Sequence, residues 1–284
     1  MFQQVLSYIF LAAGFIFGAA ILYLIRRDRD IMRSEQGSLP FLAIMETIIF
    51  IIASVGISDY LQNTLLFKYA KLGDDKVLPG TLVACGLVPG AIIGFSLLKS
   101  GDPLDPLMMV ACGGCVLAGS FTGSRLVGKF DSAKIRKIMQ VALIASFVLV
   151  IVKTVVSAGV AGTAASLPMG KLILAAALCF ATGAINMFGI PMKPTWTAMF
   201  LILGLSPIVT LTLVLVVAGL CPLSGGINVL KRGVYHRKQV FCAVIFGSLG
   251  ALIGTSLAVS IPANILNIVL LGVMLVAIVT MFKK

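Results

Sequence analysis

The feature that most constrains this chain is a series of long apolar runs separated by short basic loops. About 20 apolar residues in a helix cross the roughly 30 Å hydrocarbon core of a bilayer. The runs are residues 2–25, 79–98, 107–124, 138–156, 208–227, 240–260 and 265–282. A soluble core explains at most one such run. The sequence therefore predicts an all-α integral membrane protein with about seven transmembrane helices.

Composition supports this class and argues against nucleic-acid binding. Hydrophobic residues make up 60% of the chain and charged residues 11%, whereas a soluble domain carries roughly a quarter charged residues. The net charge is +12, but the Lys and Arg residues form short clusters between apolar runs, where they set membrane topology.

Residues 2–25 lack a basic leader and a cleavage motif, so we expect a retained span.

Two further apolar segments, 41–67 and 172–205, are interrupted by Gly, Pro and polar residues. Residues 41–67 would extend about 40 Å as one helix, which is long for one span and too short for two. Each segment is therefore either one broken, tilted span or a re-entrant hairpin that enters and leaves on the same side.

The positions of the basic clusters favour the hairpins. If both segments crossed fully, the clusters at 68–76 and 125–137 would lie outside. If both are hairpins, every basic cluster lies in the cytoplasm, as the positive-inside rule expects. The predicted protein is then a multi-pass plasma (inner) membrane protein, with the N-terminus outside and the C-terminus cytoplasmic.

The two halves of the chain carry similar Gly and Pro landmarks at an offset of 131 to 133 residues. Pro89 corresponds to Pro222, and Gly119-x-x-x-Gly123 corresponds to Gly250-x-x-x-Gly254. Each half contains a hairpin and three spans, and because three is odd, the repeats insert with inverted topology. The predicted organisation is an extra helix and linker (1–40), a first repeat (41–156), a linker (157–171) and a second repeat (172–284).

The second interrupted segment contains Lys193, an ionisable residue in apolar surroundings. A charge within the bilayer costs several kcal/mol and indicates a partner or a functional role. Pro191 and Pro194 interrupt the helix nearby, and a helix N-terminus favours anions. We expect Lys193 to bind an anion together with neighbouring side chains, unless its amine extends to the membrane surface. These neighbours are Asn186, Thr195, Trp196 and Thr197.

The break in the first segment carries an acid, Asp59. We expect it to pair with Lys193 in the empty site or to carry a coupling proton; the alternative is a helix cap at the water boundary. The polar residues expected to face the anion beside it are Ser58, Gln62 and Asn63. Glu46 is expected to be solvated near the cytoplasmic edge.

No enzyme, metal site or cofactor is expected. Cys112 and Cys115 form a C-x-x-C pattern, but small residues surround it, which favours helix packing over metal or redox chemistry. The single histidine, His236, lies in a basic loop, and the sequence has no nucleotide-binding P-loop. An intramembrane enzyme using Asp59 as an acid would need a second acid or nucleophile close by.

Four stretches of the second half carry a family resemblance. They are 203–207 (LGLSP), 225–233 (GGINVLKRG), 246–254 (FGSLGALIG) and 260–266 (SIPANIL). In this order they resemble the sulfite exporter TauE/SafE family, of which the first half is a fainter copy. The resemblance implies transport of small anions, such as sulfite, organosulfonates or small carboxylates. The chain departs from the family's Gly-rich hairpin stretch, which here reads GISDY (56–60) and GIPMK (189–193).

Together these features predict a secondary transporter of a small anion, most specifically sulfite or an organosulfonate, that works by alternating access with ion or proton coupling. Transport of a small carboxylate is the alternative. A rival from another class is a non-transporting assembly or signalling subunit, which would have no polar cavity between the hairpins. The expected partners are the anion, a coupling proton or cation and the lipid bilayer, and the sequence is compatible with a homo-oligomer.

Overall fold

The computed structural model describes residues 2–100, 103–127 and 162–257, with isolated positions between 129 and 148. The expected spans 138–156 and 265–282 lie largely or wholly outside these residues. The helices are α1 (Phe2–Arg27), α2 (Arg29–Ser34), α3 (Leu39–Ser54), α4 (Asp59–Tyr69), α5 (Leu78–Ser100), α6 (Pro106–Val127), α8 (Met169–Asn186), α9 (Lys193–Ile202), α10 (Pro207–Arg232), α11 (Arg237–Cys242), η1 (Ala243–Gly247) and α12 (Ser248–Leu257).

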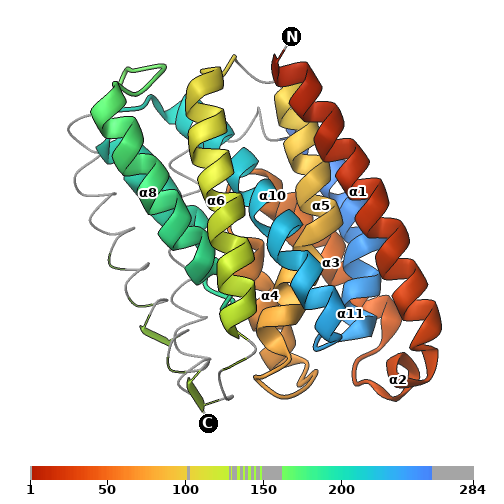
Figure 1. The fold of residues 1–284 in the computed structure, drawn as a ribbon. Coiled ribbons are helices and arrows are strands. Elements are labelled where there is room, and N and C mark those ends of the chain that lie inside the picture. Colours follow the sequence, from red (N-terminus) through yellow and green to blue (C-terminus); the bar gives the residue numbers. More distant parts are fainter. Residues whose placement is uncertain are drawn as a thin grey trace.

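The described chain has the architecture of a multi-pass α-helical membrane protein (Figure 1). Six of its helical segments are long and apolar enough to cross a membrane. They are α1, α5, α6, α8, α10 and the continuous segment Arg237–Leu257, which joins α11, η1 and α12. Five of these coincide with expected spans. The sixth, α8, falls in the interrupted segment 172–205, where the sequence predicts the first arm of a hairpin; at 18 residues it is long enough to cross.

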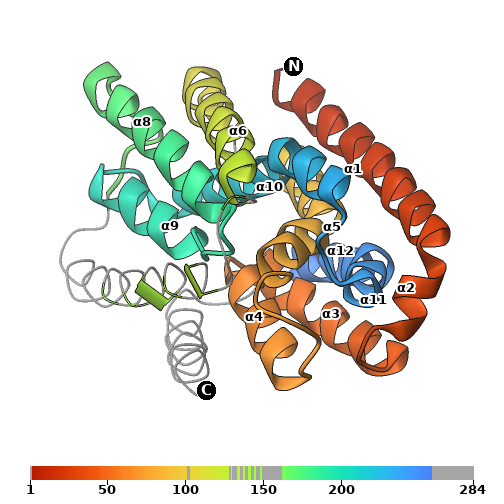
Figure 2. The ribbon, with the colours of Figure 1, turned by 60° about the horizontal axis from the view of Figure 1, so that its bottom comes forward.

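The bundle is built around α5 and α10. Of the apolar window of α10, 78% is buried, against 22% for α1, and Figure 2 shows α5 and α10 in the middle with α1 along one side. Large apolar side chains of α1 point outward; Phe15 and Tyr23, for example, are 72% and 68% exposed. Such an outer surface suits contact with lipid rather than water.

The bundle has two ends, which differ in the elements that they bring together. We call one end the basic end; it brings together α2, the loop before α5 and the residues between α10 and α11. There the backbone N–H of His236 donates to Thr81 Oγ1 at 2.9 Å, and Arg237 pairs with Asp28. The opposite end holds the start of α1, where the Gln3 side chain accepts from the Leu104 N–H at 3.2 Å.

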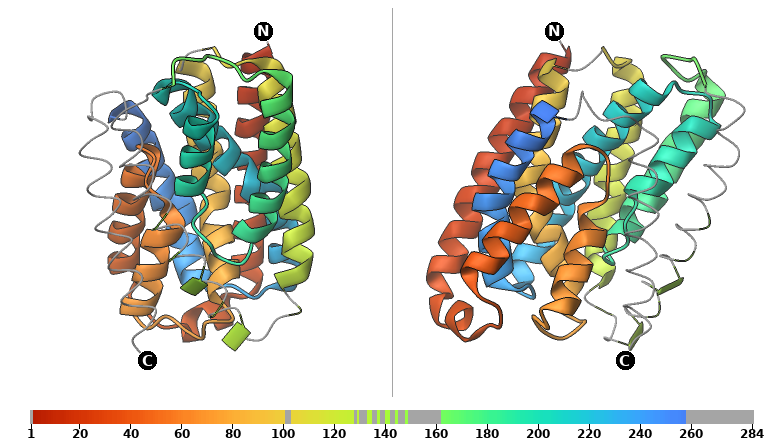
Figure 3. Two further views of the ribbon diagram at one scale, coloured as in Figure 1. Left: turned by 90° about the vertical axis from the view of Figure 1, so that its left-hand side faces the viewer. Right: turned by 180° about the vertical axis from the view of Figure 1, so that it is seen from behind.

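Both interrupted segments are hairpins in the structure (Figure 3). The α3–α4 hairpin begins and ends at the basic end, where Gly37 and Leu72 are in contact. The α8–α9 hairpin begins and ends at the opposite end, where Ala164 and Leu205 form an isolated bridge. The hairpins therefore reach into the bundle from opposite ends.

Close helix contacts link each hairpin to a helix from the other half of the chain. Gly119 and Gly123 of α6 lie against the backbone of α8, where a Cβ would overlap the carbonyls of Phe180 and Ala184. Gly250 and Gly254 of α12 lie in the same way against the carbonyls of Thr47 and Ile51 in α3. Glycines permit backbones to approach this closely. The two contacts are related by the offset found in the sequence.

Candidate functional site

The two hairpins turn in the same way. Each turn contains a glycine with positive φ, Gly56 (100°) and Gly189 (85°), a conformation that other L-residues adopt only with strain. Each second arm then begins at an ionisable residue, because α4 starts at Asp59 and α9 at Lys193. The backbone thus places one acid and one base at corresponding positions of the two hairpins.

Lys193 and Asp59 form an ion pair between the hairpin tips. Lys193 Nζ lies 2.8 Å from Asp59 Oδ1, and it also donates to the carbonyl oxygen of Ala53 at 3.4 Å. Both residues are only 7% exposed. A buried charge is tolerated when it is paired and hydrogen-bonded. The pairing therefore explains why both charged side chains can be buried here. The Lys193 side chain is directed to Asp59 and is largely shielded from solvent.

The helix termini add to the field at this pair. Asp59 occupies the first turn of α4, where a negative charge interacts favourably with the helix dipole. Lys193 occupies the first turn of α9, where a positive charge interacts unfavourably. Two positive helix ends and an ammonium group therefore meet a single carboxylate, an arrangement that favours further negative charge.

A small cavity borders the ion pair. Its walls come from both hairpins and from the central helices α5 and α10. The lining residues are Phe50, Ser58, Asp59, Tyr60, Gly86, Gly90, Ile93, Asn186, Met192, Lys193, Trp196, Leu215, Ala218, Gly219 and Pro222. This cavity is polar at the ion pair and apolar elsewhere, as is usual for small-molecule sites.

Five residues named from the sequence line this cavity: Ser58, Asp59, Asn186, Lys193 and Trp196. Their roles differ in part from those expected. The indole N–H of Trp196 donates to Thr182 Oγ1 at 2.7 Å, so the ring contributes to the cavity wall while its donor is used elsewhere. The Asn186 amide donates to the Ile190 carbonyl at 2.9 Å and braces the hairpin turn.

The other four expected residues are not among those that line the cavity. Thr197 donates to the Lys193 carbonyl at 2.8 Å, as hydroxyls within helices often do, and Thr195 lies on the same helix away from the cavity. The Gln62 amide donates to the Ser58 carbonyl at 3.3 Å. Asn63 accepts from Gln239 at 2.8 Å. Proximity in sequence suggested these positions, but the helical twist directs them elsewhere.

The sequence analysis missed the contribution of α5 and α10. Gly90 and Gly219 face each other where these helices cross. Gly86 lies beside Asp59: a Cβ added to this glycine would be 3.4 Å from Asp59 Oδ2. The signal was available, because Pro89 and Pro222 were recognised as repeat landmarks within long helices. Proline interrupts the helical hydrogen-bond ladder, and here the interruptions lie next to the site.

Glu46 lies elsewhere than expected. It is fully buried, not solvated at an edge, and its Oε1 accepts from Gln239 Nε2 at 3.0 Å. Glu46 does not line the cavity at the ion pair. The expectation of a solvated Glu46 is wrong because α11 packs over this part of α3 and covers the carboxyl group.

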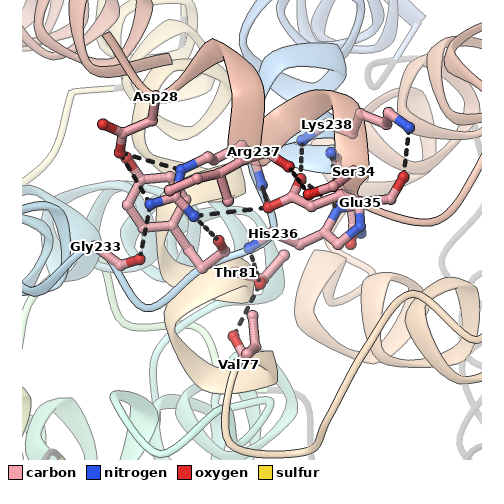
Figure 4. Close-up of polar contacts among 12 residues, drawn as sticks. Asp28, Ser34, Glu35, Val77, Thr81, Gly233, His236, Arg237 and Lys238 are labelled. Carbon is pink, nitrogen blue, oxygen red and sulfur yellow. Dashed lines mark hydrogen bonds and ion pairs between the residues drawn. The ribbon is translucent and has the colours of Figure 1, made fainter.

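The basic end is closed by a polar network (Figure 4). Arg237 donates to Asp28 Oδ2 through Nη2 at 2.9 Å and through Nε at 3.2 Å. The Glu35 carboxylate accepts from the backbone N–H groups of Arg237 (2.9 Å) and Lys238 (2.8 Å), which begin α11. Hydrogen bonds from Arg27 and Arg237 lower the pKa of Asp28. Burial lowers the pKa of His236. The network fastens α1 and α2 to α11.

Comparison of the chain with protein-family models, curated proteins and solved structures found no match.

Proposed function

We propose that this protein is a secondary membrane transporter of a small anion, which binds at Lys193 where the two hairpin tips meet. The observation that carries the proposal is the buried Lys193–Asp59 pair at the wall of a cavity deep in an apolar helical bundle. Ionisable residues in such bundles mark substrate and ion pathways. A non-transporting subunit would have no need of this polar cavity.

The ion pair suggests how anion binding and coupling are linked. In the empty site Asp59 neutralises Lys193. An anion that enters the cavity competes with Asp59 for the ammonium group, and the two positive helix ends favour it further. The displaced Asp59 carboxylate then needs a proton or another cation, because an unpaired buried charge is costly. Anion entry thus requires uptake of a coupling ion.

The arrangement of the hairpins supports alternating access. The hairpins reach the cavity from opposite ends, and each is packed on a helix of the other half through glycine contacts. Inverted repeats with broken helices at the midplane are a recurring transporter design. In our proposal, one hairpin and its partner helix move against the other pair and open the cavity to one side at a time.

The substrate class is proposed from the resemblance to the TauE/SafE family together with the site. Sulfite or an organosulfonate is the first candidate, and a small carboxylate is the second. A lysine ammonium is a point charge that binds sulfonate and carboxylate alike. Size and the remaining cavity wall must decide between them.

The chain provides its own probe, because Trp196 is the single tryptophan and lines the cavity. We would titrate the purified protein with sulfite, thiosulfate, sulfoacetate, taurine, acetate and lactate and follow the fluorescence of Trp196. At least one anion should give a saturable change. Flux of that anion into proteoliposomes, with and without a pH gradient, then tests transport.

The informative variant is the double substitution Asp59→Asn/Lys193→Gln, which we call the neutral pair. It removes both charges together, so no unpaired buried charge remains. It should bind and transport the anion at least tenfold more weakly. Lys99→Gln removes an exposed cation that lies over Phe95 at the opposite end and should behave as wild type. Flux that survives in the neutral pair would show that the site is wrong, and absence of binding and flux for every anion would refute the proposed function.

A further inference from the structure

A second buried polar cluster lies apart from the ion pair, and we call it the Glu46 cluster. It consists of Glu46 of α3, Asn63 of α4 and Gln239 of α11, which are at most 1% exposed. Gln239 Nε2 donates both to Glu46 Oε1 at 3.0 Å and to Asn63 Oδ1 at 2.8 Å. Three helices therefore meet at one carboxyl group and two amides.

The Glu46 cluster has hydrogen-bonding capacity that is not used. Gln239 Oε1 is buried and has no hydrogen-bond partner. Glu46 Oε2 and Asn63 Nδ2 are also buried and have no partner within 3.5 Å, although Asn63 lies close enough to Glu46 to interact with its carboxyl group. Next to them, His236 Nδ1 accepts from the Gln239 N–H at 3.2 Å. Nearly all buried polar atoms in proteins are hydrogen-bonded, so this concentration of unpaired atoms distinguishes the cluster from ordinary packing.

The amides of Gln239 and Asn63 are the polar partners of Glu46, and no cation in the part of the chain that the structure describes offsets a negative charge on it. Within the described residues, no Lys, Arg or His side chain lies within ion-pair distance of it. The titratable groups that interact electrostatically with Glu46 are Asp59 of α4, Cys85 of α5 and Cys242 of α11. An unpaired carboxylate is far costlier to bury than a carboxylic acid. The protonated acid is therefore the less costly state of Glu46 at this buried position.

We propose that Glu46 is a proton-binding site that drives transport, separate from the anion site and exchanging with water at the basic end. The inference rests on the proposed transport function and adds to it a second proton-binding group, distinct from Asp59. In this state Asp59 is ionised and paired with Lys193, and Glu46 is protonated and neutral. Neither carboxyl group then carries an unpaired charge.

The two amides suit both states of Glu46. In the acid form, the hydroxyl at Oε2 is a donor, and Gln239 Oε1 is an unused acceptor in the same cluster. In the carboxylate form, Gln239 Nε2 still donates, and Asn63 Nδ2 is an unused donor. A site that has a free donor and a free acceptor can accommodate loss and uptake of one proton without a large rearrangement.

The location suggests the route of the proton. Gln239 is the third residue of α11, whose first turn is fastened at the basic end by Glu35 and Asp28. When α11 separates from α3 and α4, water reaches Glu46, the O–H bond breaks, and the proton passes to that water while the carboxylate stays behind. The charged groups at this opening are Asp28, Glu35, Arg237 and Lys238.

The first test needs no substrate. The infrared spectrum of the purified protein should show a carboxylic acid C=O band that shifts in D2O and weakens as pH rises. Glu46→Gln should lose this band, whereas Asp105→Asn, which removes an acid at the opposite end, should keep it. A band that persists in Glu46→Gln would overturn the proton site.

The second test uses proteoliposomes and an anion identified with the wild type. Glu46→Gln should exchange labelled anion at equal pH within about twofold of wild type, but lose at least tenfold in accumulation driven by a pH gradient. Glu46→Asp should retain the drive with a shifted pH profile, which a merely structural role does not predict. Unchanged accumulation in Glu46→Gln overturns the proposal. If wild type exchanges no anion, the transport function fails, while the infrared test still decides whether Glu46 holds the proton.

Discussion

The two hairpins share a backbone plan and differ in chemistry. Each turns at a positive-φ glycine, and each second arm begins with a buried ionisable residue. In α3–α4 that residue is the acid Asp59, and in α8–α9 it is the base Lys193. The ion pair therefore joins corresponding positions of two similar elements. The similar backbones of the hairpins thus bring these two positions together. The side chains at the two positions make the site asymmetric, because one is an acid and the other is a base.

The hairpins also differ in how they are held. The turn of α8–α9 is braced from within, by Asn186 on the Ile190 carbonyl and by Trp196 on Thr182. The α4 arm is held from outside, through Asn63 and the Gln239 amide of α11. We infer that Lys193 sits on the more rigid arm, while Asp59 sits on the arm that is connected to Glu46.

The largest effect should come from breaking the ion pair on one side. Lys193→Ala leaves Asp59 buried and unpaired, and removing one partner of a buried pair costs about 3–5 kcal/mol. We expect the free energy of unfolding in detergent to fall by this amount, measured by circular dichroism during chemical denaturation. The neutral pair Asp59→Asn/Lys193→Gln should recover most of the loss. Equal destabilisation in the single and double variants would show that the two charges do not depend on each other.

The glycine contacts test whether the two halves are equivalent. Gly119→Val and Gly250→Val each place a side chain against a backbone carbonyl, of Phe180 or Thr47. Overpacking of this kind costs about 1–3 kcal/mol, and we expect similar losses in the two variants by thermal unfolding. Gly114→Ala is the control: a Cβ there meets nothing within 4 Å, and alanine favours the helix by about 1 kcal/mol. Strongly unequal losses would contradict equivalent packing of the halves.

Much of the fold could be predicted from the sequence because it follows from the lengths of apolar runs and the positions of basic clusters. Run lengths located five of the six described span-length segments, and the placement of basic clusters favoured hairpins over broken spans. The close approach of Asp59 and Lys193 was also expected, since few ionisable residues occur in the apolar segments. These signals depend on the number and spacing of residues rather than on the orientation of individual side chains.

Orientation is where the prediction failed. Thr195 and Thr197 adjoin Lys193 in sequence, but only Trp196 among them lines the cavity. Asn63 and Glu46 lie far apart in sequence from Gln239, and no local pattern indicates that α11 packs against both. Such contacts depend on the rotation of each helix and on tertiary packing, which a single sequence does not specify.

A smaller effect should sharpen the difference between the two turns. Asn186→Ala removes the donor for the Ile190 carbonyl and leaves that oxygen without this hydrogen bond. A buried group left unsatisfied costs about 1–3 kcal/mol. Thermal unfolding should show this loss, and hydrogen exchange should increase in the α8–α9 turn more than in the α3–α4 turn. Equal increases in both turns would argue against a separately braced hairpin.

The smallest effect concerns the basic end, which holds the α11 arm near Glu46. Hydrogen bonds from Arg27 and Arg237 lower the pKa of Asp28 from its ordinary value of 3.8. The folded state therefore binds this proton less readily than the unfolded state does, and the contribution of Asp28 to stability is present above pH 3.8 and lost as pH falls below it. Asp28→Asn should lower the unfolding temperature slightly at pH 6 and should show a smaller further decrease than wild type between pH 4 and pH 3. A variant that loses as much stability as wild type in acid would show that other carboxyl groups, such as Glu35, dominate the network.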